Sequence, residues 1–234
     1  MSELSASNKL RSQYHEELSR LETQAVGGFD LVIRSLDRTM EAVFTQDMEL
    51  AQIVVNDDDQ IDGRYLEVHQ GLITLLAMQS PVATDLRLIA ALIHVIKALE
   101  RMGDQCVNIA KLIPLAGHEP PVDRRLMDLI VEMGKQVRVE VSQARRALTD
   151  RNVPLAWNLR TLDDRVDEVS RSIFGVAIEV GDDLDRREWA MTMLLAARAL
   201  ERIGDNAVDV GEQVVFVVTG LFRSTEHPSY PELP

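Results

Sequence analysis

ALERMGDQCVNIA, from Ala98 to Ala110, returns later in the chain as ALERIGDNAVDVG, from Ala199 to Gly211. Seven of the thirteen aligned positions are identical, and Met102 against Ile203 exchanges one bulky apolar side chain for another. Self-similarity at a long period is typical of a duplicated structural unit. We therefore expect two related units in one chain.

Each copy places two acids four residues apart, Glu100 with Asp104 and Glu201 with Asp205. On an α-helix this spacing leaves both carboxylates on one face, about 40° apart. The same face is otherwise apolar, as at Ile96 before the first pair. Like charges one turn apart destabilise a helix by ~0.2–0.5 kcal/mol, and by more where apolar neighbours draw them toward a core. A positive group must compensate these acids.

A second kind of acid pair precedes each copy, Asp58 with Asp62 in NDDDQID and Asp163 with Asp167 in LDDRVD. The later of these pairs follows the earlier by 105 residues, and the acids of the repeated stretch are 101 residues apart. The pairs, their order and nearly their separation are thus repeated. A chance acidic helix surface does not produce this pattern.

Composition limits the function classes that remain. The 234 residues carry a net charge of −13, and the basic residues are interspersed with acids, so no patch suits a nucleic-acid backbone. The single Cys106 excludes an internal disulfide and a cysteine-rich zinc site, and its apolar setting predicts a buried thiol. The polar N-terminus lacks the features of a secretory signal, and no apolar run reaches a membrane span. We expect a soluble, cytoplasmic protein without membrane insertion.

Apolar residues recur every three or four positions through most of the chain, which predicts long amphipathic helices. Pro81 interrupts this pattern and offers Ser80 or Thr84 as the next helix cap, while Asp47 is a candidate cap earlier in the chain. The Pro-rich segment 114–121 is the natural boundary at mid-chain. Strand-like alternation is not evident. The predicted helices cover residues 4–45, 47–79, 86–113, 122–148, 152–180 and 184–218.

The architecture that fits this pattern is all-α, a tandem repeat of two antiparallel three-helix bundles. Short breaks between consecutive helices allow antiparallel neighbours within each half. We expect the first repeat to cover residues 1–115 and the second to cover 122–220. A polar, Pro-rich tail follows over 221–234.

If the second and third helices of each half lie side by side, the two kinds of acid pair converge. Four carboxylates form an all-oxygen ligand set, which suits Fe³⁺, Mn²⁺, Mg²⁺ or Ca²⁺ and is poor for copper or structural zinc. Asn108 and Asp209, one turn further on, are candidate supporting ligands. The predicted metal ligands are Asp58, Asp62, Glu100 and Asp104 in the first half, and Asp163, Asp167, Glu201 and Asp205 in the second.

Two other readings of the acids stay open. The first is a metal-free helical protein, in which the acids either form a solvated surface neutralised by nearby arginines or, in an adaptor, bind basic patches of a partner. The arginines considered for this role are Arg64, Arg101, Arg165 and Arg202. The second is a carboxylate-bridged metal enzyme, but such bundles use Glu-x-x-His, and none of the five histidines has Glu three residues before it. No phosphate-binding GxxxxGK[ST] or GxGxxG motif occurs either, so we expect no catalytic residues.

The residues also carry a family resemblance. ALERMGD and ALERIGD, the upstream DxxxD pairs and PVATDLR at 81–87 resemble the PhoU family of phosphate-uptake regulators over nearly the whole chain. The second half departs from this pattern, with DLDRREW at 183–189 in place of PVATDLR.

The resemblance implies a fold, a cofactor and a function. It implies tandem three-helix bundles, multinuclear iron or zinc clusters in some members, a cytoplasmic location and a homodimer. It further implies negative regulation of phosphate uptake and phosphate-responsive signalling. The implied partners are the ATPase subunit of the phosphate ABC transporter and a sensor histidine kinase.

Overall fold

The computed structural model describes residues 2–78, 81–117 and 123–221. These residues form six α-helices and one short 3₁₀ helix, which confirms the predicted all-α fold. The predicted cap Ser80 and the predicted tail over 222–234 lie outside the described residues. The helices are α1 (Ser2–Thr45), α2 (Met48–Met78), α3 (Ala83–Leu112), α4 (Arg124–Thr149), α5 (Val153–Ile178) and α6 (Leu184–Thr219), with the 3₁₀ helix η1 over Pro114–Ala116.

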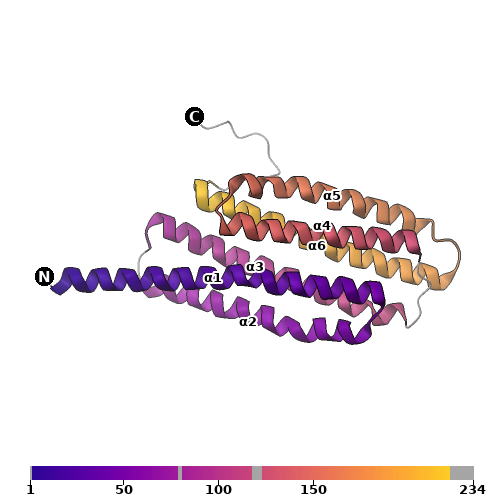
Figure 1. Cartoon of the computed structure of the whole chain (residues 1–234), viewed down its shortest axis with the longest axis horizontal. Coiled ribbons are helices and arrows are strands. Elements are labelled where there is room, and N and C mark those ends of the chain that lie inside the picture. The colour runs from indigo at the N-terminus through magenta and orange to yellow at the C-terminus, as the bar shows by residue number, and fades with distance from the viewer. Residues whose placement is uncertain (1, 79–80, 118–122, 222–234) are drawn as a thin grey trace.

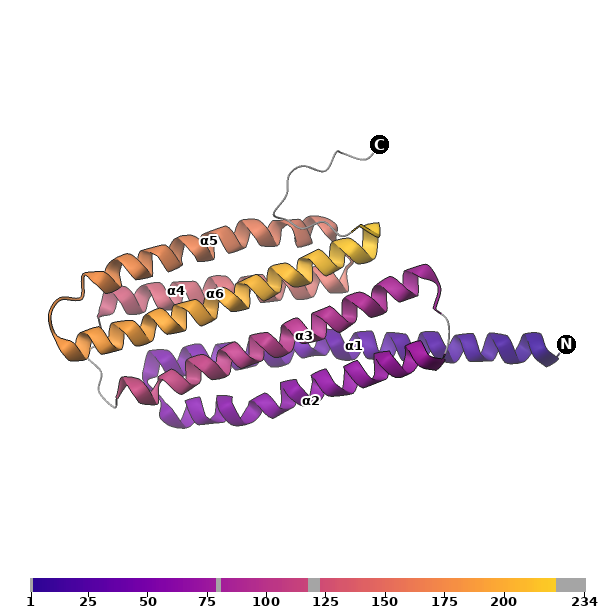
Figure 2. The same ribbon diagram turned by 180° about the vertical axis from the view of Figure 1, so that it is seen from behind.

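The helices are grouped in threes, as Figure 1 shows, and each group is an antiparallel bundle. Helices α1 to α3 contact one another, and α4 to α6 do the same. The two bundles lie side by side through α3 against α6 and α1 against α4, and Figure 2 shows the first of these contacts from the opposite side. Helices α2 and α5 therefore lie at the outer sides of the molecule, away from the interface between the bundles.

Side-chain caps start several helices. The Asp47 carboxylate accepts a hydrogen bond from the backbone N–H of Leu50 at 2.9 Å, which confirms the predicted cap before α2. Asn152 caps α5 and Asp183 caps α6 in the same way. The predicted start of α3 at residue 86 is wrong, because the helix begins at Ala83 without a side-chain cap and Thr84 lies inside it. Pro81 disfavours helical backbone only at the residue before it, so the helix can begin at Ala83, three residues before the predicted start.

The turns after α1 and α4 preserve the repeat in detail. Gln46 and Arg151 both adopt left-handed backbone conformations, with φ of 56° and 50°. The amide N–H of the following residue donates to a carbonyl five residues earlier in both turns. The two turns are 105 residues apart in the sequence, which is also the separation between Asp58 and Asp163. The first two helices of each half can therefore be aligned residue by residue.

Three ion pairs join the bundles on one side. Each pair takes its acid from α1, and its arginine comes from α4 or, for Arg151, from the turn that follows α4. The order of the partners is reversed along the two segments, so α1 and α4 run antiparallel. Exposed pairs of this kind contribute little to stability individually, but together they fix the register of the two helices. The pairs are Glu22 with Arg151, Asp30 with Arg145 at 2.8 Å, and Asp37 with Arg138 at 2.6 Å.

One continuous apolar core extends across the two bundles, and a second core cluster fills the end of the first bundle near Tyr14 and Leu75. Among the described residues, no helix has an apolar stretch long enough to cross a lipid bilayer.

Two glycines of α2 predict opposite responses to alanine. A Cβ atom at Gly71 would lie 2.4 Å from Cδ2 of the fully buried Leu21, whereas a Cβ at Gly63 would meet nothing within 4 Å. Alanine gains ~1 kcal/mol of helix propensity at either site, but overpacking a core costs ~1–3 kcal/mol. We expect Gly63→Ala to raise the free energy of unfolding in urea and Gly71→Ala to lower it. A Gly71→Ala protein as stable as Gly63→Ala would contradict the close packing of α1 on α2.

Candidate metal centres

The four acids predicted for the first half converge where α2 packs against α3. Asp58 is partly buried, and burial followed by repulsion from Asp62, Asp104 and Glu100 raises its pKa to about 6. Burial, together with Glu100 and Asp62, also raises the pKa of Asp104. Asp62 and Asp104 are exposed at the surface. The site is therefore a shallow acidic cluster with one inner carboxylate, that of Asp58.

The second half repeats this arrangement between α5 and α6. Asp163 is only 4% exposed, and burial, Asp205 and Asp167 raise its pKa to about 6. Glu201 and Asp167 in turn contribute, after burial, to a raised pKa of Asp205. The structure thus brings together the predicted acids of each half, and in each half the inner carboxylate belongs to the first Asp of the DxxxD pair.

The glycine of each repeated stretch makes room for that inner aspartate. A Cβ atom at Gly103 would lie 2.9 Å from Asp58 Oδ1, and one at Gly204 would lie 3.1 Å from Asp163 Oδ1. The 2.9 Å distance is shorter than a real Cβ atom shows, so a side chain at position 103 would displace the Asp58 carboxylate. The glycines therefore let a carboxylate from the neighbouring helix reach the surface of α3 or α6.

A fifth acid, Glu140 of α4, lies beneath the second cluster. Its side chain is fully buried, and burial followed by repulsion from Asp163, Asp167 and Asp205 raises its pKa to about 8. The sequence pattern did not identify it, because Glu140 has no acid four residues away. A usable signal was its position between Val137 and Ala144, on the apolar face of its helix.

Among the described residues, the shortest ion pairs of the two clusters involve the outer glutamates. Lys97 pairs with Glu100 at 2.6 Å, and Arg198, its counterpart in the repeat, pairs with Glu201. Arg160 approaches Asp163 Oδ2 at 3.9 Å, but Asp163 Oδ1 is buried without a hydrogen-bond partner. Each cluster therefore retains uncompensated negative charge at its inner end.

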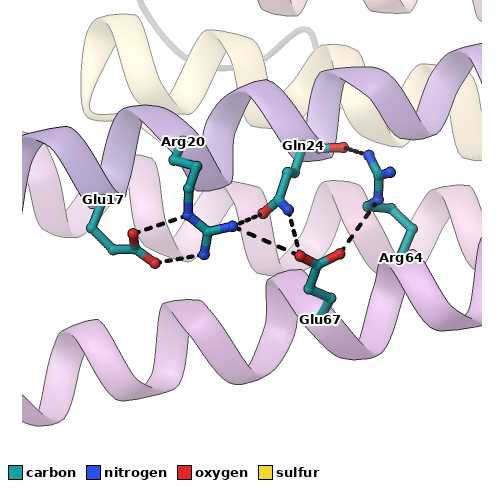
Figure 3. A network of polar contacts seen from close by, with 5 residues as sticks. All are labelled: Glu17, Arg20, Gln24, Arg64 and Glu67. Carbon is teal, nitrogen blue, oxygen red and sulfur yellow. Dashed lines mark hydrogen bonds and ion pairs between the residues drawn. The ribbon is translucent and has the colours of Figure 1, made fainter.

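The arginines considered as neutralising partners are placed differently. Arg64 belongs to a network between α1 and α2, shown in Figure 3, in which it donates to the Gln24 carbonyl at 3.0 Å and pairs with Glu67 at 3.8 Å. Glu17 and Arg20 extend this network along α1. Arg101, on α3, lowers the pKa of Asp209 across the interface between the bundles. Arg165 and Arg202 are exposed.

The two predicted supporting residues differ in their surroundings. Asn108 is exposed and donates a 3.4 Å hydrogen bond to Gln105. The pKa of Asp209 is raised by burial, Glu212 and Asp205, and lowered by Arg101 and His94. Asp209 thus faces both its own cluster and the α3 side chains of Arg101 and His94. Their roles as ligands remain predictions.

The side chains of the two clusters supply the oxygen ligands that a hard cation prefers, although the clusters do not enclose an ion. Among the described residues, no three His, Cys, Asp or Glu side chains surround one point closely enough to hold a metal ion. Yet Asp163 Oδ1 and both carboxylate oxygens of Glu140 are buried without partners in the described part of the chain. Oxygen donors of this kind suit iron, manganese or magnesium. Binding would therefore require the carboxylate side chains to rotate toward a common ion.

These features define a class, a tandem helical scaffold with one acidic cluster in each half. The family model described as PhoU domain matches residues 28–113 and 130–214. The chain belongs to the PhoU family. This membership confirms the predicted resemblance and the prediction that the protein is not an enzyme.

Similar proteins span almost the entire chain. The phosphate-specific transport system accessory protein PhoU homolog 1 of Mycobacterium leprae is 31% identical over 91% of this chain and 96% of its own length. A PhoU homolog of Clostridium acetobutylicum is 30% identical over 90% of this chain and 96% of its own. The crystal structure of PhoU from Pseudomonas aeruginosa shares 27% identity, with a TM-score of 0.80 over 89% of this chain and all of that one. PhoU from Streptococcus pneumoniae has the same fold, with a TM-score of 0.83 at 24% identity over 90% of this chain and 99% of that one.

Proposed function

We propose that this protein is a cytoplasmic negative regulator of phosphate uptake and of phosphate-responsive signalling. The observation that carries the proposal is membership of the PhoU family over both halves of the chain, together with relatives named as accessory proteins of phosphate-specific transport. The protein acts through contacts with the ATPase subunit of the phosphate ABC transporter and with a sensor histidine kinase. It does so as a homodimer.

The two acidic clusters bind hard metal cations in this proposal. The supporting observation is that each cluster holds an inner carboxylate whose pKa is raised by burial and neighbouring acids. A bound cation would remove this repulsion and would tie α2 to α3 and α5 to α6. The donors favour iron, manganese or magnesium over zinc, because each cluster contains only oxygen ligands. The ligands are Asp58, Asp62, Glu100 and Asp104, and Asp163, Asp167, Glu201 and Asp205, with Asn108 and Asp209 as supporting residues.

The domain division follows the same repeat. We assign the first unit to residues 1–115, the second to 122–220 and a polar tail to 221–234. The continuous core between the bundles implies that neither unit is stable alone, because each would expose its side of that core to water.

A metal-free adaptor is the second candidate function. It is favoured by the exposure of Asp62, Asp104 and Asp205, which lets a basic surface of a partner protein reach them. The two candidates share the fold and the partners and differ in whether the purified protein contains metal.

Elemental analysis of protein purified without chelators separates these candidates. We expect bound iron or another hard cation in the wild type and about half of that content in Glu100→Gln/Asp104→Asn, since only the first cluster loses two ligands. Asp128→Asn/Glu132→Gln serves as the control, because it removes the same charge from acids at the same spacing on α4. An unchanged metal content in the first variant would exclude the first cluster as a metal site.

A binding assay tests the regulatory contacts separately. We expect purified protein to retain the transporter ATPase subunit and the cytoplasmic part of the sensor kinase in a pull-down. Failure to retain either protein would exclude the proposed partners, whatever the metal content.

A further inference from the structure

Glu140 is a buried ionisable side chain with no compensating partner among the described residues. Its side chain is 0% exposed, and neither carboxylate oxygen has a hydrogen-bond partner within residues 2–78, 81–117 and 123–221. A Cβ atom at Gly204 would lie 2.6 Å from Glu140 Oε2 and 3.1 Å from Asp163 Oδ1. The carboxylate therefore points from α4 to the place where Asp163 meets α6.

The first half has no counterpart to this acid. The matched turns after α1 and α4 and the matched Asp58 and Asp163 fix an offset of 105 residues, and this offset aligns Glu140 with Ser35. The Ser35 side chain forms a hydrogen bond with the thiol of Cys106. The first cluster therefore has four carboxylates and a hydroxyl-bearing residue below them, whereas the second has five carboxylates.

An unpartnered buried carboxylate is costly unless it is protonated or meets a cation. The charged groups that shift the pKa of Glu140 are the acids Asp163, Asp167 and Asp205, and no basic group is among them in the part of the chain that the structure describes. Its carboxylate adds a buried donor near Asp163, whereas Asp205 is exposed. More carboxylate ligands strengthen the binding of a hard cation.

We propose that Glu140 is a cation ligand of the second cluster and that the two halves are consequently unequal, the second half binding a hard cation more tightly than the first. This inference rests on the proposed metal binding by both clusters. It identifies α4 as a third helix that the second ion holds, so that this ion joins all three helices of its bundle. In the first half the ion joins only two.

Titration of the full-length, metal-free protein with MnCl₂ tests this inference, with free Mn²⁺ measured by electron paramagnetic resonance. For the wild type we expect two classes of site. Glu140→Gln should weaken the tighter class at least tenfold and leave the weaker class unchanged. Glu100→Gln/Asp104→Asn should remove the weaker class. Glu132→Gln, an exposed acid two turns earlier on α4, is the matched control and should bind as the wild type does.

The reciprocal variant keeps the test independent of how well Glu140→Gln folds. Ser35→Glu supplies the missing carboxylate to the first half, and we expect it to tighten the weaker class at least tenfold. Equal affinities in wild type and Glu140→Gln, no tightening in Ser35→Glu, or loss of the tighter class in Glu100→Gln/Asp104→Asn would each overturn the inference while leaving metal binding itself intact. Absence of saturable Mn²⁺ binding in the wild type would overturn the inference and the proposed metal binding together.

Discussion

Glutamine in place of Glu140 is expected to stabilise the metal-free protein strongly at alkaline pH. The pKa of this carboxyl group rises from an ordinary 4.5 to about 8 in the folded chain, so the folded state binds more protons than the unfolded state between these values. Stability must therefore fall as pH rises through this range, by about 1.4 kcal/mol per pH unit for one group. Glutamine resembles the protonated acid and does not ionise.

Chemical unfolding of metal-free protein between pH 5.5 and pH 9 measures this effect. We expect the free energy of unfolding of the wild type to fall by about 3 kcal/mol from Glu140 alone over this interval. Asp58 and Asp163, whose pKa values are raised to about 6, add a smaller loss near the acidic end. Glu140→Gln should lack most of the decline above pH 6, and Glu132→Gln should retain it. Parallel curves for wild type and Glu140→Gln would show that Glu140 is not a repelled buried carboxylate.

Loss of both inner aspartates is expected to abolish regulation in cells. Asp58→Asn/Asp163→Asn replaces the inner carboxylate of each cluster with an amide of the same size. The amide is a poorer ligand for a hard cation than the carboxylate. We expect a phosphate-responsive reporter in high-phosphate medium to rise to the level of a strain that lacks the gene. Immunoblotting checks that the variant protein accumulates normally.

The matched variant Asp128→Asn/Glu132→Gln should preserve repression, because these acids lie outside both clusters. Full repression by Asp58→Asn/Asp163→Asn would separate regulation from metal binding and would favour the metal-free adaptor. If deletion of the gene itself left the reporter unchanged in high phosphate, the regulatory function would be refuted for this protein.

The repeat explains how much of the site was predictable from the sequence. Helical spacing places Glu100 and Asp104 on one face, and the 105-residue offset identifies Asp58 and Asp163 as equivalent positions. These patterns predicted which acids meet, and the structure brings them together. The resemblance carried by the same residues predicted the family.

Other features depend on contacts that periodicity does not describe. Glu140 belongs to a helix outside the predicted acid pairs, and its importance appears only once α4 packs beneath Asp163. Lys97 and Arg198, rather than Arg64 or Arg202, pair with cluster acids because side chains three residues apart are neighbours on a helix. Periodicity predicts which face of α3 is buried, but not that α6 covers part of it.

An anomalous-scattering map from crystals of wild-type protein purified without chelators tests the central claim most directly. The account predicts one peak or cluster of peaks beside Asp58 and Glu100, and a second beside Asp163 and Glu201 that also contacts Glu140. A map without a peak at either cluster, from crystals in which the carboxylates are well ordered, would contradict metal binding as the role of these acids.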